Sequence, residues 1–324
     1  RRNETLVVEN RAEQEPERWW KNTLEILAEL EQKLGSGTGK AIRGICISSH
    51  AVSLLPVDAA GTPLRRAMIW MDSRSDSELT WLLEQIGRER FCSIVGAQPS
   101  PSFLPGKLLW FRKNEPELMN KTACLLQANS FITSRLTGRF TIDLDQAAKS
   151  QCLDVSHGQW SREIGEAIGV ELDQLLPPPQ SPQTIAGTVT RQAAEQTGLA
   201  EGTPVLTGCS DAVAAIWAMG LSRLGEAGES VGTTSLVFAG ADRPSATTGP
   251  VVSHPFRPGT IPYLFDAPIS TSGAAVEWFL KNLAGERLLQ CRNAGGDVYE
   301  LLSNMAAQSP PGSGGLLFLP YLRG

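Results

Sequence analysis

The stretch VLTGCSDAVAAIWAMGL, Val205–Leu221, decides the fold class because it reads as a strand that runs directly into a helix. Asp211 is its one charged residue, and the residues that follow are small or apolar. Ser210 can cap the helix, which places Asp211 in the first turn at the carboxyl end of a strand. Ligands of α/β folds bind at such ends, and a helix N-terminus favours an ionised carboxylate. Asp211 therefore suits a general base, although an acidic residue in a first turn is also common as a simple cap.

Strand and helix patterns alternate along the rest of the chain, which predicts an α/β fold. Hairpin-like strand pairs near residues 42–70 and 229–240 indicate mixed sheets flanked by helices. The apolar run IRGICISS (42–49) is predicted to be a buried strand, and GGLLFLPYL (314–322) a final strand. Helices are predicted over 16–34, 75–90, 128–138, 161–169, 191–199, 272–283 and 297–307.

Composition excludes several classes of protein. The 324 residues are 41% hydrophobic and 19% charged, with a net charge of −5 and no basic run of the kind that binds nucleic acid. No apolar run is long enough to cross a bilayer. Six cysteines and three histidines are scattered along the chain, so we expect no metal site built from them. We expect a cytoplasmic protein with reduced thiols and no nucleic-acid or membrane partner.

Two further segments carry polar groups of functional interest. In VGTTS (231–235), Gly232 in a tight turn followed by Thr233 and Thr234 could expose backbone N–H groups to phosphate oxygens, although such hairpin turns are common. WMDSR (70–74) places Trp70, Asp72 and Arg74 at the end of a strand, where a ring and two charged groups suit a polyol. The alternative for WMDSR is a surface Asp–Arg pair beside a core Trp.

In their order along the chain, these segments resemble the FGGY carbohydrate kinases, and within them the xylulokinase-type members. The resemblance covers nearly the whole chain. It implies the actin/hexokinase/Hsp70-like (ribonuclease H-like) two-domain kinase fold, with a sugar-binding domain over 1–224 and the beginning of an ATP-binding domain over 225–324. The segments are EPERWW, ISSHAVSLLPVDAAGTPLRRAMIWMDSR, PGKLLW, TIDLDQAAKSQCLDVSHGQWS, GTPVLTGCSDAVAA, SVGTTS and PYLRG.

The resemblance also implies roles for matching positions. Asp211 matches the catalytic base of the family, which deprotonates a sugar hydroxyl for attack on ATP. The Gly232–Thr233–Thr234 turn matches a phosphate-contacting Gly-Thr-Ser turn, and Trp70, Asp72 and Arg74 match a segment beside the sugar. The resemblance implies ATP with Mg²⁺, a sugar or polyol such as a ketose as acceptor, and a homodimer.

Departures from the family pattern concern the sugar. Xylulokinases carry Met-His where an ungapped alignment places Ala51 and Val52, and Ala212 follows the base where the family often has Asn or Gln. A two-residue shift would let His50 replace the family's His. His50 is therefore either a sugar ligand or a packed strand residue.

The two ends also depart from the family. The resemblance implies a phosphate-loop hairpin before RRNETLVVEN and more of the ATP-binding domain after PYLRG. On this basis we expect an ATP-dependent sugar kinase of which this chain alone is inactive. The alternative is a non-catalytic sugar-binding or interaction fragment of a former kinase.

Overall fold

The computed structural model describes residues 3–232, 235–244, 252–255, 261–269, 271–283 and 285–319. Two compact units divide the chain: unit 1 contains Arg1–Glu226 and Ala239–Phe265, and unit 2 contains Ala227–Phe238 and Asp266–Gly324. The predicted domain boundary at residue 224 stays a prediction. Within the described ranges, no helix is both long and apolar enough to cross a membrane.

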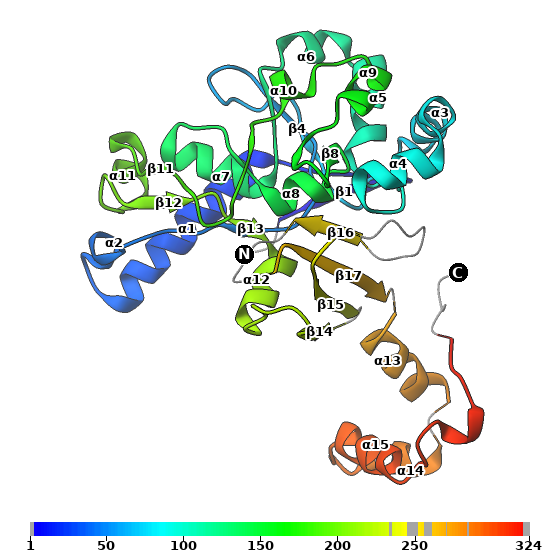
Figure 1. Cartoon of the computed structure of the whole chain (residues 1–324). Helices are drawn as coiled ribbons and strands as arrows, with labels where there is room; N and C mark the ends of the chain where they lie inside the picture. Colours follow the sequence, from blue (N-terminus) through cyan, green and yellow to red (C-terminus); the bar gives the residue numbers. More distant parts are fainter. Residues whose placement is uncertain are drawn as a thin grey trace. The chain divides into compact units, whose positions relative to one another are not determined.

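Unit 1 alternates short strands with helices (Figure 1). Its strands up to residue 226 are β1 (Thr5–Val8), β2 (Arg11–Gln14), β3 (Ser48–Ser49), β4 (Leu55–Val57), β5 (Ala67–Met68), β6 (Cys124–Leu126), β7 (Ile142–Asp143), β8 (Leu153–Asp154), β9 (Gln159–Trp160), β10 (Pro179–Gln180), β11 (Ile185–Thr188), β12 (Pro204–Leu206) and β13 (Cys209–Ser210). Its helices are α1 (Pro16–Leu34), α2 (Thr38–Ala41), α3 (Asp76–Ile86), α4 (Arg88–Val95), α5 (Leu104–Asn114), α6 (Pro116–Lys121), α7 (Ala128–Thr137), α8 (Leu144–Lys149), α9 (Arg162–Ile168), α10 (Leu172–Leu175), α11 (Arg191–Thr197) and α12 (Asp211–Ala218).

Two parallel strands in the middle of unit 1 position the site. β3 pairs with β13 in parallel, and upstream of both strands an isolated parallel bridge joins Ile45 to Val205 of β12. The remaining pairings are mostly antiparallel: β1–β2–β5, β4–β6, β8–β9 and β11–β12, with β10 and β7 parallel. Mixed pairing agrees with the predicted mixed sheets.

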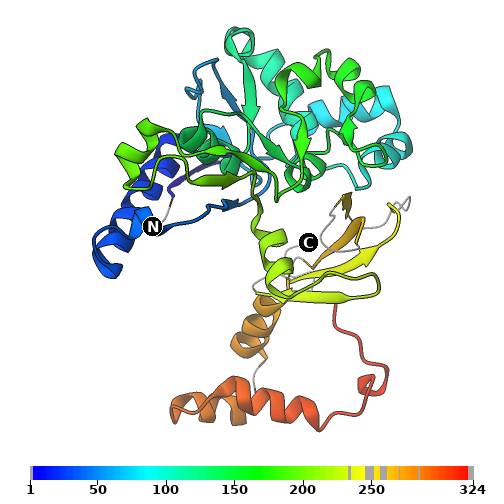
Figure 2. The same cartoon turned by 60° about the vertical axis from the view of Figure 1, so that its left-hand side comes forward.

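Buried apolar side chains form two cores in unit 1. One core lies between α1, α7 and the strands beside them, and it contains Trp19, Trp20, Phe131 and Val205. α1 packs against α7 in both views (Figure 1 and Figure 2). The second core gathers α3, α4, α5 and α9 around residues such as Phe91 and Phe111, which are completely buried. These cores hold the helices against the strands, so the strand ends keep fixed positions.

Four strands between residues 227 and 269 form a sheet of order β14–β15–β17–β16. They are β14 (Ala227–Val231), β15 (Ser235–Ala241), β16 (Val252–Pro255) and β17 (Tyr263–Ile269). The neighbouring β14 and β15 confirm the predicted strand pair near residues 229–240. The helices of unit 2 are α13 (Gly273–Asn282), α14 (Glu286–Asn293) and α15 (Val298–Ala307), followed by a 3₁₀ turn, η1 (Ser313–Gly315).

One predicted strand was wrong in its burial, and another does not form in the described residues. IRGICISS was predicted to be buried, but Gly44, Cys46 and Ser48 are exposed, and in this run the structure has only β3 and the bridge at Ile45. Apolar composition predicts strand character but does not say whether both faces are covered. In GGLLFLPYL, residues 316–319 are exposed and form no strand; its last residues lie outside the described ranges.

Candidate functional site

The carboxyl ends of β3 and β13 bring two predicted site residues together. Ser49 is the register partner of Ser210, and each is the last residue of its strand. His50 and Asp211 therefore directly follow two neighbouring parallel strands. Both therefore leave the sheet at the same edge. The carboxyl edge of parallel strands is where α/β folds place their ligands.

Asp211 begins α12, as the sequence predicts. Ser210 caps this helix, because its Oγ accepts a hydrogen bond from Val213 N at 3.4 Å. Asp211 Oδ1 accepts from Ala212 N at 2.8 Å, and the side chain remains exposed. A carboxylate held at a helix N-terminus yet open to solvent can accept a proton from a bound hydroxyl group.

His50 is half-buried and has a fixed orientation. Its Nε2 is hydrogen-bonded to Ser53 Oγ at 2.9 Å, and its ring meets Trp19 edge-on at 5.8 Å between centroids. Burial lowers the pKa of the imidazole, the charge of Asp211 opposes this effect, and Lys107 adds to it. The effect of Asp211 on the pKa of His50 agrees with the strand register, which places the two residues side by side.

A pocket of about 320 Å³ borders His50 on the side of α1. Its lining includes Trp19, Asn22, Ile47 and Ser49, a mixture of aromatic, amide, aliphatic and hydroxyl groups. Asn22 Nδ2 donates to Asn3 Oδ1 at 2.6 Å. Sequence reasoning did not find this pocket because its walls come from segments far apart in the chain.

Helix α8 braces both strand ends. At the end of β3, Gln146 Nε2 donates to His50 O at 3.2 Å and to Ser49 Oγ at 3.4 Å. At the end of β13, Ser210 N donates to Asp145 Oδ2 at 3.2 Å, and Lys149 Nζ donates to Ser210 Oγ at 3.0 Å. α8 lies beside β13 (Figure 1). The segment TIDLDQAAK (141–149) contains two acidic residues and a lysine among apolar residues, a pattern that indicates buried polar contacts. The sequence analysis assigned no role to these three residues.

The start of α8 is itself a buried polar network. Asp143 caps the helix through Gln146 N at 2.9 Å and accepts from Asn129 Nδ2 at 2.7 Å. Burial raises the pKa of the Asp143 carboxyl, and the charge of Asp145 adds to this effect, whereas the two hydrogen bonds oppose it. Asn129 N also donates to Ser49 Oγ at 3.1 Å, which ties the network to β3.

WMDSR departs from the interpretation as a surface Asp–Arg pair beside a core Trp. Asp72 is completely buried and forms an ion pair with Arg74 at 2.6 Å, and it also accepts from Ala12 N at 2.7 Å. Arg74 also pairs with Glu13 at 2.6 Å. Trp70 is 51% exposed, so the pair is in the interior and the ring is at the surface.

Lys107 supports the same turn, and the sequence did not single it out. Its side chain is completely buried, and Nζ donates to Ile69 O at 2.7 Å. The same carbonyl accepts from Asp72 N at 2.9 Å, which closes the turn that presents Trp70. Burial lowers the pKa of the Lys107 ammonium group to about 7, with Asp72 opposing the shift and Arg74 adding to it.

The predicted phosphate turn belongs to unit 2. Gly232 follows β14, and its carbonyl accepts from Gly273 N at 2.9 Å at the start of α13. Thr233 and Thr234 lie outside the described residues. Among the residues that the structure describes, no group of three or more His, Cys, Asp or Glu side chains could hold a metal ion.

Comparison with known proteins assigns the family. The N-terminal domain of the FGGY family of carbohydrate kinases matches residues 3–218. Xylulose kinase of Bacillus subtilis (strain 168) is 28% identical over 314 residues, 97% of this chain and 60% of the relative. Xylulose kinase of Escherichia coli (strain K12) is 32% identical over 228 residues, 70% of this chain and 46% of the relative.

A solved structure agrees with the sequence comparisons. The crystal structure of xylulose kinase from Rhodospirillum rubrum matches with a TM-score of 0.87 and 25% identity, over 100% of this chain and 64% of that one. The chain thus has the actin/hexokinase-like fold of sugar kinases and spans about 60% of the length of the relative from Bacillus subtilis. It belongs to the FGGY family of carbohydrate kinases.

Proposed function

We propose that the protein to which this chain belongs phosphorylates a hydroxyl group of a sugar or polyol at the expense of ATP. The observation that carries this proposal is the position of His50 and Asp211 at the ends of two neighbouring parallel strands. His50 can bind a sugar hydroxyl group, and the exposed carboxylate of Asp211 beside it can accept the proton of that hydroxyl group.

In the proposed reaction, Asp211 accepts the proton of the attacking hydroxyl group. The hydroxyl oxygen forms a bond to the γ-phosphorus of ATP, the bond from that phosphorus to the bridging oxygen breaks, and ADP leaves. Phosphoryl transfer depends mainly on positioning and charge stabilisation, so the fixed strand ends suit it. We expect N–H groups of the turn at Gly232, Thr233 and Thr234 to contact phosphate oxygens.

We expect Trp70 to contact the sugar through its exposed ring, which can pack on C–H groups. Asp72 and Arg74 satisfy each other in the interior, so in this proposal they position the turn of Trp70. We expect Mg²⁺ to accompany ATP and to neutralise charge on its phosphates. No step of the proposal runs through a protein-bound metal ion.

Xylulose is the first acceptor to test, because the relatives from Bacillus subtilis and Escherichia coli are named xylulose kinases. Ala51, Val52 and Ala212 offer no side-chain hydrogen bond to a sugar, so a panel of other ketoses and polyols is needed as well. A homodimer and a cytoplasmic location stay predictions, which sedimentation and fractionation would test.

The deciding experiment replaces Asp211 and uses a matched control. The same Ser–Asp pair begins α3, where Ser75 precedes the exposed Asp76. In the complete product of the gene, we expect Asp211→Asn to lower kcat about a thousandfold. Sugar affinity should change only a few-fold, and Asp76→Asn should change neither. Near-normal turnover of Asp211→Asn would remove Asp211 from the role of base.

His50→Ala tests the other half of the site. A sugar ligand predicts a raised KM for the preferred sugar with the KM for ATP unchanged, and His157→Ala, which removes an exposed imidazole elsewhere, should leave both unchanged. A lower Tm with unchanged KM values would make His50 a packing residue. Sugar binding without phosphorylation by the complete gene product would favour a non-catalytic sugar-binding protein.

A further inference from the structure

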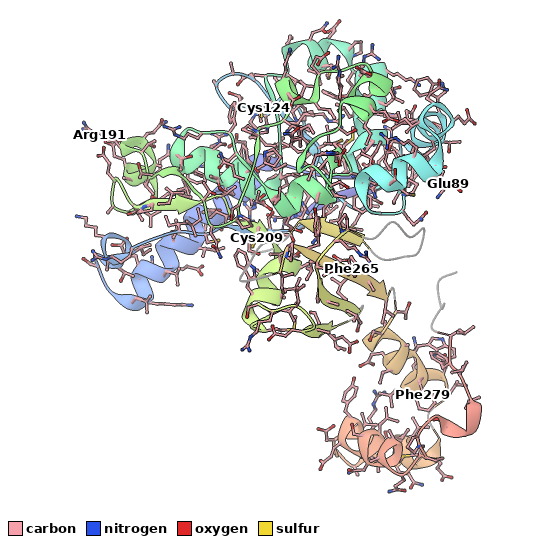
Figure 3. All side chains as sticks on the ribbon, viewed as in Figure 1. Glu89, Cys124, Arg191, Cys209, Phe265 and Phe279 are labelled. Atoms are coloured by element: carbon pink, nitrogen blue, oxygen red, sulfur yellow. The ribbon has the colours of Figure 1, made fainter. Side chains whose placement is uncertain are left out.

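The exposed Asp211 depends on its buried neighbour Ser210 for its position. The carboxylate of Asp211 accepts from Ala212 N, the next amide along the chain, and is otherwise open to solvent. Ser210 is completely buried. Figure 3 labels Cys209, the residue immediately before Ser210, where the chain passes from β13 into α12. The direction of the Asp211 side chain therefore depends on how firmly Ser210 is held.

The cap of α12 holds Ser210 only weakly. Val213 N donates to Ser210 Oγ at 3.4 Å, whereas an ordinary N–H···O hydrogen bond is about 2.9 Å long. α12 has eight residues, too few for a stable helix by itself. Other contacts must therefore fix the residue that precedes Asp211.

An ion pair on α8 supplies such contacts. Asp145 and Lys149 are four residues apart, so they share one face of the helix. Asp145 Oδ2 accepts from Ser210 N at 3.2 Å, and Asp145 Oδ1 pairs with Lys149 Nζ at 3.2 Å. Lys149 Nζ in turn donates to Ser210 Oγ at 3.0 Å. The three residues thus close a ring that holds both the backbone and the side chain of Ser210.

Burial distinguishes this pair from an ordinary helical ion pair. The side chains of Asp145 and Lys149 are 2% and 11% exposed. In α11, Arg191 and Glu195 have the same spacing but are 82% and 67% exposed, and Figure 3 shows Arg191 at the outer edge of unit 1. A buried ion pair stabilises a protein little more than apolar residues of the same size would. Stability therefore does not account for the Asp145–Lys149 pair, whereas its contacts with Ser210 do.

We propose that Asp145 and Lys149 are positioning residues for Asp211 and act on it through Ser210. The inference rests on the proposed role of Asp211 as the base. A base must lie within hydrogen-bond distance of the proton that it accepts, and a displacement of about 1 Å can lower a rate about a hundredfold. Loss of the pair should therefore lower kcat. Sugar binding, which the proposed function assigns to His50 and Trp70, should change little.

The kinetic test uses the complete product of the gene. Lys149→Met should lower kcat at least about tenfold and change the KM for the sugar less than about twofold. In an Asp211→Asn background the same substitution should lower kcat no further, because the base that Lys149 positions is already absent. Arg191→Met, the exposed control, should change neither constant. Equal losses of kcat with and without Asp211, or no loss at all, would overturn the proposal.

Amide hydrogen exchange in the same protein tests the contacts with Ser210 independently of activity. The peptide spanning residues 209–213 should exchange about tenfold faster in Lys149→Met and in Asp145→Asn, which preserves side-chain volume, but not in Arg191→Met. Unchanged exchange in both variants would overturn the proposal, even if kcat falls. Faster exchange together with near-normal turnover of Asp211→Asn would place the failure in the proposed base and not in the contacts of α8 with Ser210.

Discussion

The Asp72 carboxylate is an ion that the protein has removed completely from water. Arg74 and Ala12 N compensate this charge, and Arg74 also pairs with a second carboxylate, Glu13. A buried ion pair stabilises a protein little more than a well-packed apolar pair does. Removal of one partner, however, leaves an uncompensated charge in the interior. The exposed pair of Arg162 and Glu166 keeps its hydration and contributes far less.

This contrast makes a prediction at the residue scale. Asp72→Asn should lower the free energy of unfolding by about 3 kcal/mol, because Arg74 loses the more deeply buried of its two carboxylate partners. Glu166→Gln, the matched exposed carboxylate, should change it by less than about 0.5 kcal/mol. Urea unfolding followed by tryptophan fluorescence measures both. Equal effects of the two substitutions would show that the interior pair is hydrated in solution.

Lys107 gives the second residue-scale prediction, on pH dependence. Its pKa falls from 10.5 to about 7 on folding, so the folded state favours the neutral amine. Its contribution to stability is therefore full above pH 10.5 and is lost as the pH falls toward 7. The free energy of unfolding of the wild type minus that of Lys107→Met should decrease between pH 10 and 7.

The exposed Lys121 supplies the control, since Lys121→Met at the surface should change the free energy of unfolding by less than about 0.5 kcal/mol. Denaturant titrations at several pH values measure both variants. A pH-independent difference for Lys107→Met would mean that Lys107 keeps its charge in the folded protein.

Single residues were predicted unevenly, for a physical reason. Asp211 could be placed from sequence because its surroundings, a capping Ser and an apolar helix, are local. The partners of Asp72 and the proximity of His50 to Asp211 depend on segments far apart in the chain. Those distant contacts decide whether an Asp binds a ligand or an arginine. They cannot be predicted from the local pattern of a single sequence.

At the scale of elements, α8 determines how firmly the site is held. It has only six residues, too few for a stable helix by itself, yet it hydrogen-bonds both β3 and β13. The short strands likewise contribute few hydrogen bonds of their own. Order at the strand ends should therefore come largely from the side chains of α8.

Gln146→Ala tests this role. Loss of its two donor contacts should speed amide hydrogen exchange at the end of β3, near Ser49 and His50, by about tenfold. Gln192→Ala replaces an exposed Gln in α11 and should leave exchange there unchanged. Mass spectrometry of peptic peptides resolves both regions. Unchanged exchange in Gln146→Ala would show that backbone pairing alone holds the strand end.

Elements with local signals were predicted well. α9 ends at Gly169, which has a positive φ of 80°, and α1 begins at Pro16, because caps and breakers act over a few residues. The hairpin β1–β2 went unpredicted, since its central residues Val8–Arg11 include no glycine. The error in IRGICISS concerns burial, which depends on what packs against a strand.

At the scale of the whole molecule, the two units differ in how much apolar surface they bury. Unit 1 has two extended cores with residues such as Phe91, Phe111 and Phe131 completely buried. In unit 2, α13, α14 and α15 share a small cluster around Leu280, Leu288 and Val298. Buried apolar area supplies most of the stability of a folded unit, so their stabilities should differ.

We therefore expect unit 2 to unfold first. In rising urea, amide exchange of α13–α15 should become complete at lower denaturant than exchange of α5 and α7, because about 25 cal/mol of stability is lost for each Å² of apolar surface left unburied. The small cluster can be tested directly: Leu288→Ala should move only the earlier transition, and Leu108→Ala only the later one. A sugar bound beside His50 and Asp211 should raise the later transition alone, since mass action stabilises the unit that binds. A single transition shared by all peptides would show that the two units fold as one cooperative body.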